Sequence, residues 1–249
     1  MLILLTNDDG IYAEGLIELE KALKRVAEVM VFAPDREQSA SSHSLTLERP
    51  LRIHQRDKNH FACDGTPTDC VLLAVHGILK HKAPDLVISG INHGSNMGED
   101  VTYSGTVAAA IEGANLGIPS LAVSNTDAAN FPSYQPAARF IARLVRQFGK
   151  LGLKSSTFLN INFPKLKGRE FKNYRFTKLG RREYRDIVIE NTDPRGKHYY
   201  WIGGESTWED IDGSDFEAVS EGYVSISPLK MNFSDLPSIG KLQNIKLRF

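Results

Sequence analysis

Runs of apolar residues without a polar interruption recur along the first two thirds of the chain. They occupy Leu2–Leu5, Val29–Ala33, Leu86–Ile88 and Leu121–Val123, and an alternating run follows at Phe158–Phe163. An uninterrupted apolar run is typical of a strand that is buried on both faces, as in a parallel sheet. Pro34 and Pro164 directly follow two of the runs and are expected to end those strands.

Helical patterns alternate with these runs. Apolar residues recur at helical spacing from Leu16 to Val26, from Val71 to Leu79 and from Ala137 to Phe148, and Val107–Leu116 is rich in small residues. Thr66 and Pro67 suit the N-cap and first position of the second of these helices. Strands alternating with helices predict an α/β fold with a mostly parallel sheet. Residues 45–63 are predicted to form short strands in an excursion from that sheet.

The composition changes after Pro164. Residues 165–185 hold nine Lys or Arg against two Glu, and the acidic segment Glu190–Glu221 follows. We predict strands at His198–Ile202 and at Tyr223–Ser227, the latter stopped by Pro228, and a short helix at Asp215–Glu221. Residues 1–164 are therefore interpreted as an α/β core that carries the site. Residues 165–249 are interpreted as a β-rich portion packed on this core and not as an independent domain.

Charge and cysteine content narrow the class of protein. The 249 residues include 30 Lys or Arg and 30 Asp or Glu, so the formal net charge of zero gives no general argument for nucleic-acid or membrane binding. The basic, aromatic segment after residue 165 could contact nucleic acid. We favour the two alternatives that its charges pair with the acidic segment or that they form a solvated surface, so no stable nucleic-acid partner is expected. Two cysteines, no leader and no membrane-length apolar stretch indicate a reducing cytoplasm. Cys70, at a helix start, is expected to be a small buried residue and not a reactive thiol.

Polar residues stand where the first strand ends. Asn7, Asp8, Asp9 and Gly10 follow Leu2–Leu5, and ligands of open α/β sheets bind beyond the carboxyl ends of strands. Two adjacent carboxylates repel each other, so a site that keeps both ionised usually binds a cation between them. Oxygen ligands favour Mg, Mn or Ca over Zn. The alternative is a polar turn in which Asp9 caps the next helix. The serine-rich loop Asp35–Ser44 ends at the same edge, and its hydroxyls could reach a metal or a phosphate, or form an exposed turn.

The longest loop of the core runs from Ser89 to Thr106. It contains four glycines, and Ser104-Gly105-Thr106 opens the small-residue helix. Free N–H groups at a helix start, with two hydroxyls, favour an anion site, whereas the alternative is a structural glycine-rich turn. The glycine spacing fits neither a P-loop nor a dinucleotide fingerprint. No second histidine stands at ligand spacing from His93, so a hydrogen-bonding role in the loop is favoured for it.

Several of these segments together resemble the SurE family of stationary-phase survival proteins. They are Asn7–Gly10, Ala33–Ser39, Asp64–Pro67, Ser89–Asn92, Tyr103–Ala110, Asn160–Pro164 and Gly222–Ile226. The resemblance implies a Rossmann-like three-layer α/β/α core with a β-rich C-terminal extension. It also implies a cytoplasmic, divalent-metal-dependent 5′/3′-nucleotidase that forms dimers or tetramers through a C-terminal β-hairpin. One ion per subunit, Mg or Mn, would be held by Asp8, Asp9, Ser39 and Asn92.

A mechanism follows from that ligand set. Two carboxylates, a hydroxyl and an amide carbonyl carry a charge of about −2, which neutralises one divalent ion. A metal-activated water would then attack the phosphorus of a nucleoside monophosphate in line. Asp8 and Asp9 would be catalytic, while Asn96 and Ser104-Gly105-Thr106 would hold the phosphate. Two rival functions are considered. A phosphatase with an aspartate nucleophile needs two carboxylates separated by one residue, whereas Asp8 and Asp9 are adjacent. A non-catalytic nucleotide sensor would need no metal at the phosphate. The segment 172–200 is expected to exchange between subunits.

Overall fold

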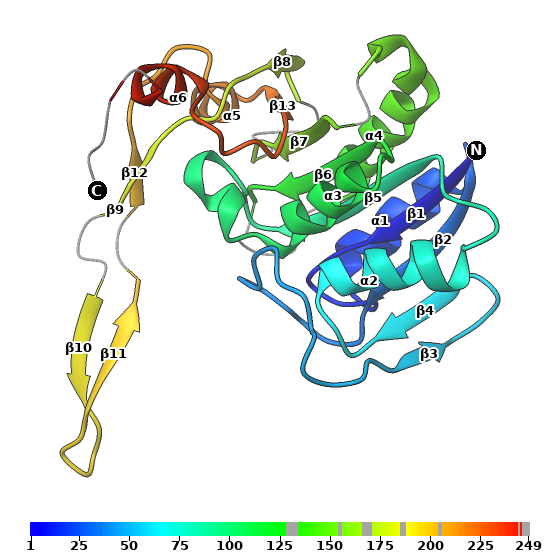
Figure 1. Ribbon diagram of the computed structural model, residues 1–249, viewed down its shortest axis with the longest axis horizontal. Helices are drawn as coiled ribbons and strands as arrows, with labels where there is room; N and C mark the ends of the chain where they lie inside the picture. Colours follow the sequence, from blue (N-terminus) through cyan, green and yellow to red (C-terminus); the bar gives the residue numbers. More distant parts are fainter. Residues whose placement is uncertain are drawn as a thin grey trace.

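The N-terminal apolar run forms β1 (Leu2–Thr6), which lies inside a nine-stranded sheet (Figure 1). The computed structural model describes residues 1–127, 134–153, 156–165, 171–184, 188–203, 206–243 and 245. In order across the sheet, the strands are β3 (Ile53–Gln55), β4 (His60–Cys63), β2 (Glu28–Pro34), β1, β5 (Leu86–His93), β6 (Ser120–Asn125), β7 (Phe158–Phe163), β13 (Val224–Leu229) and β8 (Tyr174–Phe176). Neighbours from β4 to β7 are parallel, whereas β3 and β13 run antiparallel to β4 and β7.

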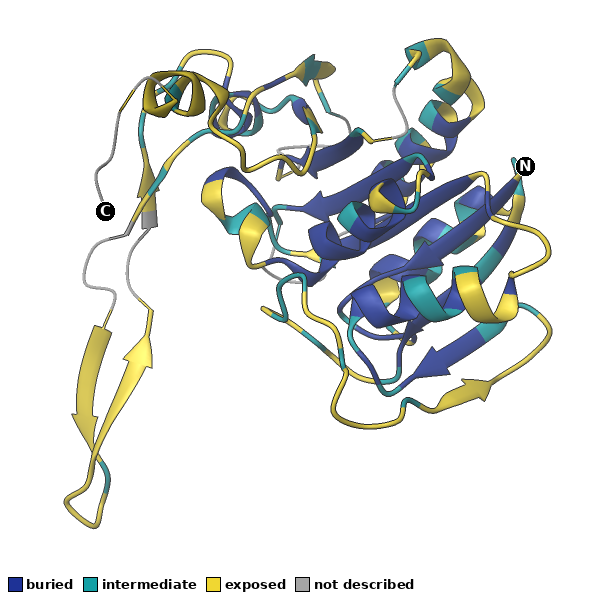
Figure 2. Cartoon of the chain, in the orientation of Figure 1, coloured by how far each residue is buried: buried dark blue, intermediate teal, exposed yellow. Residues whose placement is uncertain are grey.

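Helices cover both faces of this sheet, and Figure 2 shows the buried strands between them. One face carries α1 (Glu14–Leu23) and α4 (Gln135–Gln147), whose apolar residues share a cluster with β1, β2 and β5 to β7. The other face carries α2 (Pro67–Leu73), which continues as the π-helical turn Ala74–Ile78, and α3 (Gly105–Asn115). The predicted three-layer α/β/α core is therefore confirmed.

Local sequence signals account for several element boundaries. Thr66 caps α2 in a capping box with Asp69, and Pro67 opens the helix, as predicted. Cys70 is fully buried in this helix, and burial raises the pKa of its thiol, which confirms the structural interpretation. The strand predicted at Phe158–Phe163 and the strand predicted at His198–Ile202 have the expected bounds.

Two expectations are wrong. Residues 45–63 are not an excursion, because β4 pairs in parallel with β2 along Val31–Pro34 and thereby joins the main sheet. Pro228 does not stop its strand, since β13 continues to Leu229. The neighbouring β8 reaches only as far as Ile226 of β13, so Pro228 lies at an edge position where its missing N–H breaks no ladder.

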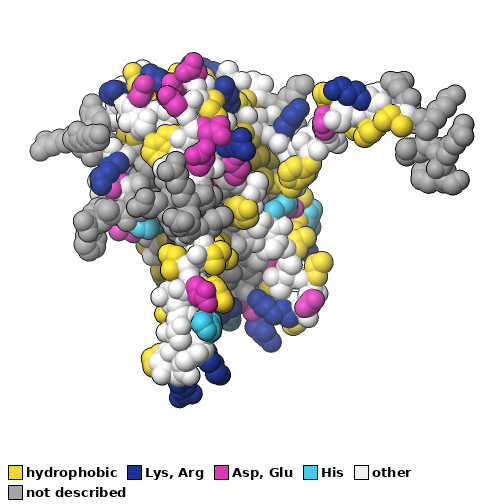
Figure 3. All heavy atoms as spheres, turned by 90° about the vertical axis from the view of Figure 1, so that its left-hand side faces the viewer, with side chains coloured by type: hydrophobic (Ala, Val, Ile, Leu, Met, Phe, Trp, Pro, Cys, Tyr) yellow, Lys and Arg dark blue, Asp and Glu magenta, His cyan; other side chains and the backbone are white. Residues whose placement is uncertain are grey.

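The remaining strands form an arm that projects from the core (Figure 1). At its base β9 (Arg182–Tyr184) pairs with β12 (Ser206–Trp208), and further out β10 (Val188–Thr192) pairs with β11 (His198–Ile202). Every residue of β10 and β11 is exposed, and hydrophobic side chains lie along the arm in Figure 3. Two short helices, α5 (Asp215–Ser220) and α6 (Leu236–Leu242), complete the chain together with the 3-10 turns Gly98–Thr102 (η2) and Phe148–Leu151.

The basic segment after Pro164 lies partly outside the described residues, at 166–170 and 185. Within the described part, Arg175 pairs with Glu221 at 2.7 Å and Arg181 pairs with Glu209 at 3.3 Å. Pairing with the acidic segment, one of the two favoured alternatives, therefore occurs. In the described part of the chain, no helix is long and apolar enough to cross a membrane.

Candidate metal and phosphate site

The candidate site lies where the order of the strands reverses. From β1 the chain passes through α1 to β2 on one side, while β5 pairs with the other side of β1. Such a switch point leaves a crevice beyond the carboxyl ends of the two central strands. Asp8 and Asp9 follow β1, Ser39 follows β2 and Asn92 lies at the end of β5, so the four predicted metal ligands come from three neighbouring strand ends.

Asp8 is buried and tightly held. Its Oδ2 accepts the backbone N–H of Thr106 at 3.0 Å, and its Oδ1 accepts the Thr106 hydroxyl. Its backbone carbonyl accepts the N–H of Gln38 at 2.8 Å, which ties the loop after β2 to the site. Burial raises the pKa of Asp8 above its usual value, and the Thr106 hydrogen bonds oppose that rise.

Asp9 contacts the end of β5. Its Oδ2 accepts the backbone N–H of His93 at 3.2 Å. Burial, followed by the charge of Asp8, raises the pKa of Asp9 from 3.8 to about 6. The alternative role as a helix cap is wrong, because α1 has Ala13 at its N-cap with no side-chain hydrogen bond. His93 has the predicted hydrogen-bonding role: its Nδ1 lies 2.9 Å from the Tyr134 hydroxyl.

A third carboxylate, which sequence reasoning missed, stands beside these two. The Oε1 of Glu37 accepts the Ser39 hydroxyl at 2.6 Å. The charge of Glu37 also contributes to the raised pKa values of Asp8 and Asp9. The available signal was its place two residues before Ser39, in a loop already expected to reach the site.

A bulge in β5 sets the position of Asn92. The register against β6 shifts between Ser89 and Asn92, where β5 has one residue more than its partner. Gly90 within the bulge packs so closely that a Cβ there would lie 2.3 Å from the Val123 carbonyl oxygen. The Asn92 Nδ2 donates to the Gly94 carbonyl at 3.0 Å, so Oδ1 is the atom with which Asn92 would act as the predicted metal ligand.

The donor set fits a divalent cation. Asp8 and Asp9 disfavour each other's ionisation, and a cation between them removes that penalty. Two carboxylates, a hydroxyl and an amide carbonyl are the oxygen ligands that Mg²⁺ and Mn²⁺ prefer. In addition, Asn7 Oδ1 and Ser41 Oγ are buried with no hydrogen-bond partner among the described residues, and Ser41 Oγ lies 2.8 Å from a Cβ built on Gly105.

The start of α3 supports Asp8 directly. Thr106 gives both of its donors to Asp8, and the Ser104 hydroxyl caps the helix by accepting the Val107 N–H at 3.1 Å. A Cβ on Gly105 would lie 2.9 Å from the Asp8 Cβ, so this glycine is required for close approach of the carboxylate. The assignment of Ser104, Gly105 and Thr106 to the phosphate stays a prediction, since two of the amides in the first turn are already engaged.

Asn96, the other predicted phosphate ligand, is buried in the loop between β5 and α3. Its backbone is held by Asn160 and Asn162 of β7, and its Nδ2 donates to Ser124 Oγ at 2.8 Å. The sequence places both β7 asparagines in a predicted strand and in a segment that resembles the family, but it gives no sign of their contact with Asn96.

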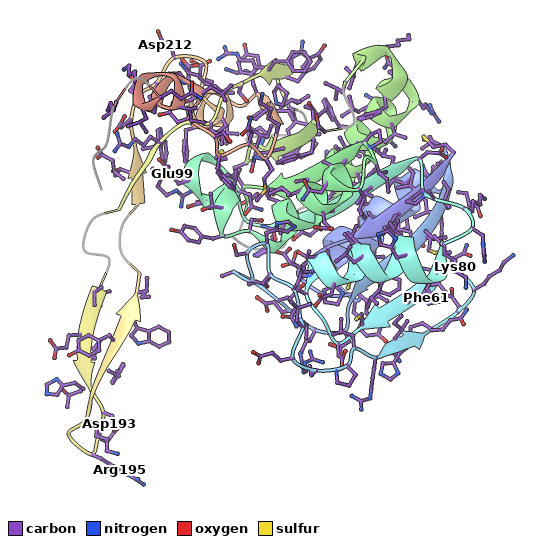
Figure 4. All side chains as sticks on the ribbon, viewed as in Figure 1. Phe61, Lys80, Glu99, Asp193, Arg195 and Asp212 are labelled. Carbon is purple, nitrogen blue, oxygen red and sulfur yellow. The ribbon has the colours of Figure 1, made fainter. Side chains whose placement is uncertain are left out.

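Asp215 fixes the loop from the C-terminal side. Its Oδ2 accepts the N–H of Gly98 at 2.9 Å, and its Oδ1 accepts the N–H of Gly180 at 2.8 Å. Nearby, Glu99 of η2 accepts the N–H of Arg182 in β9 at 2.8 Å, where η2 approaches the base of the arm (Figure 4). The sequence carried no signal for these contacts, because the partners lie 35, 83 and 117 residues apart.

Comparison with known proteins identifies the family. The family model described as "Survival protein SurE" matches residues 3–186. The chain belongs to the SurE family. The "5'-nucleotidase SurE" of Geotalea daltonii is 48% identical over 244 residues, covering 98% of each chain. The protein of the same name from Citrifermentans bemidjiense is 48% identical over 248 residues, covering 99% of this chain and 100% of the relative.

A solved structure of the family has the same fold. The crystal structure of the SurE protein from Aquifex aeolicus matches with a TM-score of 0.87 and 42% sequence identity, over 98% of this chain and 100% of that chain. The coverage includes both the core and the C-terminal portion of this SurE-family chain.

Proposed function

We propose that this protein is a divalent-metal-dependent nucleotidase that hydrolyses nucleoside 5′- and 3′-monophosphates. Membership of a family whose relatives are named 5′-nucleotidases supports the reaction. The observation that carries the proposal is the pair of adjacent, largely buried carboxylates, Asp8 and Asp9, at the switch point of the sheet. Their pKa values are raised because burial disfavours the charged forms, and a bound cation would stabilise those charged forms. SurE nucleotidases are metal-dependent enzymes, and the four residues proposed to hold the ion are Asp8, Asp9, Ser39 and Asn92.

Each residue has a definite part in that reaction. A bound divalent ion would supply Lewis-acid chemistry and an activated water. Thr106 holds the Asp8 carboxylate in one orientation, and the His93 N–H does the same for Asp9. We expect Asn96 and the start of α3 to bind the remaining phosphate oxygens.

The two rival functions make different predictions. An aspartate-nucleophile phosphatase needs two carboxylates separated by one residue, whereas Asp8 and Asp9 are adjacent. A nucleotide sensor would bind the substrate without releasing phosphate.

The decisive experiment measures phosphate release from a panel of nucleoside 5′- and 3′-monophosphates with Mg²⁺, with Mn²⁺ and with a chelator. Asp8→Asn and Asp9→Asn should abolish turnover while the protein stays folded, because each loses a charged ligand. Asp85→Asn, which changes a carboxylate at the opposite end of β5, is the matched control and should keep full activity. Chelator-insensitive release, or near-normal turnover of either site variant at limiting metal, would overturn the proposal.

We also propose that the protein self-associates as a homodimer or homotetramer through the arm. The proposed exchanged segment, 172–200, includes residues 185–187, which lie outside the described residues. The exposed apolar side chains of β10 and β11 support this assembly, since an isolated two-stranded hairpin is marginal in water.

A further inference from the structure

Two asparagines in the middle of β7 place polar side chains inside the sheet. Asn160 and Asn162 are both fully buried, and they alternate with Leu159, Ile161 and Phe163, which belong to the core on the α1 and α4 side. The two asparagines therefore face the α3 side of the sheet. There they reach the loop that carries Asn96.

Both asparagines bind the backbone of one residue, Asn96. The Asn96 N–H donates to Asn162 Oδ1 at 2.9 Å, and the Asn96 carbonyl accepts Nδ2 of Asn162 at 2.9 Å and Nδ2 of Asn160 at 2.8 Å. Residues 95–97 have no regular secondary structure, so these side chains take the place of a strand ladder. The backbone of Asn96 is thus fixed within an irregular loop.

The side chain of Asn96 is fixed as well. Its Nδ2 donates to Ser124 Oγ of β6 at 2.8 Å, in a buried position. Because its backbone and its Nδ2 are both anchored to the sheet, Asn96 would lose little further rotamer freedom on binding a phosphate. It follows Asn92 by four residues, so the segment that leaves β5 carries first a proposed metal ligand and then a proposed phosphate ligand.

Among the described residues, the arrangement leaves one buried polar atom of the two asparagines unpaired. Asn160 Oδ1 is buried with no hydrogen-bond partner in the described part of the chain. Leaving such an acceptor unpaired costs free energy and offsets part of the gain from the three hydrogen bonds to the Asn96 backbone. Polar side chains inside a sheet depart from the usual apolar pattern, and such departures occur mainly at functional sites.

We propose that Asn160 and Asn162 are positioning residues that fix Asn96 for binding of the substrate phosphate. The proposal rests on the proposed phosphatase function. It assigns a part in substrate binding to two residues that touch neither the proposed metal ligands nor the proposed phosphate ligand side chains.

A double-mutant cycle between Asn162 and Asn96 tests it. Inorganic phosphate is titrated calorimetrically into the Mg²⁺-loaded protein, and the KM and kcat for a nucleoside 5′-monophosphate are measured on the same samples. Asn162→Leu should weaken phosphate binding and raise KM by about tenfold, and leave Mg²⁺ affinity within about twofold, because the metal ligands are anchored elsewhere. In an Asn96→Ala background, Asn162→Leu should change phosphate affinity no further.

The control is Ser120→Ala. Ser120 is buried at the amino end of β6 and its hydroxyl donates to the Ile118 carbonyl at 2.9 Å, so the variant loses a buried hydrogen bond of the same sheet at the edge opposite to the site. It should lower the melting temperature without changing phosphate affinity. If Asn162→Leu does not fold, Asn160→Ala replaces it in the same cycle, with an expected loss of about threefold for its single hydrogen bond.

Two outcomes would overturn the proposal: unchanged phosphate affinity in the β7 variant, or an equal loss with and without Asn96. Absence of metal-dependent phosphate release from the unaltered protein would instead overturn the proposed function, and the two failures are therefore distinguishable.

Discussion

Thr106 determines how the buried carboxylate of Asp8 is oriented. Its backbone N–H and its hydroxyl go to different oxygens of that carboxylate. The start of α3 also places the positive end of a helix dipole beside the negative charge. The structure therefore gives Thr106 a role in supporting a proposed metal ligand, in addition to the predicted contact with phosphate.

We expect Thr106→Val to weaken Mg²⁺ binding by about tenfold or more, because a hydrogen bond to a charged group contributes about 1.5–3 kcal/mol. Valine keeps the shape of the side chain and the backbone N–H. Thr106→Ser keeps the hydroxyl and should bind Mg²⁺ nearly as the unaltered protein does. Calorimetric titration of Mg²⁺ into the three proteins measures the effect, and equal affinities would show that the hydroxyl does not support Asp8.

Asp9 makes the stability of the metal-free protein depend on pH. Its pKa is raised from 3.8 to about 6 in the folded state. Between these values the folded protein holds a proton that the unfolded chain has released, so the contribution of Asp9 to stability is lost as pH rises from about 4 to about 6. A shift of this size corresponds to about 3 kcal/mol.

Urea unfolding in the presence of a chelator measures this dependence. Compared with the unaltered protein, Asp9→Asn should gain stability on the order of 2–3 kcal/mol between pH 4 and pH 7, because the amide does not ionise. Asp85→Asn serves as the control and should show no such relative gain. A stability difference between the Asp9 variant and the unaltered protein that stays constant with pH would mean that Asp9 titrates normally.

Some site residues were predictable from sequence and others were not. Asp8 and Asp9 follow an uninterrupted apolar run, so their place at a strand end has a local cause. Asn160 and Asn162 give no local signal of their role, because their partner lies 64 and 66 residues away. Hydrogen bonds over such separations depend on strand order, which a single sequence determines only through the complete fold.

At the level of elements, α1 approaches the bulge of β5 unusually closely. Only a glycine fits at position 15, because a Cβ there would lie 2.1 Å from the carbonyl oxygen of Ile91. The first turn of α1 therefore packs directly against the backbone of the residue before Asn92. The sequence predicted the helix and the strand, but the bulge that brings them together has no periodicity by which it could be recognised.

We expect Gly15→Ala to destabilise the protein by about 1–3 kcal/mol or more, because the added carbon meets backbone that cannot rotate away. Metal affinity should fall as well, since the displaced bulge carries Asn92. Gly77→Ala is the control, because a Cβ there meets nothing within 4 Å. Thermal unfolding and Mg²⁺ titration measure both effects; unchanged values for Gly15→Ala would contradict the close contact.

For the molecule as a whole, the core was predictable to a greater extent than the arm. Buried strands leave continuous apolar runs, which led to the three-layer prediction. The strands of the arm are exposed, and their alternating pattern does not indicate which segment they pair with. The pairing of β4 with β2 was also not predictable, because it depends on which edge of β2 is left unpaired by β1. The segment division at residue 164 stays a prediction.

We expect the protein to have the mass of a dimer or tetramer at micromolar concentration, because the arm exposes apolar side chains that need a partner surface. Ile189 and Trp201 are paired across the hairpin, so replacing both with serine removes one apolar patch and should weaken association by more than about tenfold. Arg195→Gln, at the tip of the arm (Figure 4), is the control. Light scattering with size-exclusion chromatography measures the mass, and a monomer for the unaltered protein would contradict the assembly.

The long-range anchoring of Asn96 also determines when a growing chain acquires its site. By residue 106 the ribosome has delivered Asp8, Asp9, Ser39, Asn92 and the threonine that orients Asp8. The side chains that hold the backbones of Asn96 and Gly98 follow only at 160, 162 and 215. Because folding during synthesis proceeds from the N-terminus, all four proposed cation ligands are present long before the proposed phosphate loop can be anchored. The growing chain therefore carries the residues proposed for the ion well before those that fix the loop proposed for the substrate.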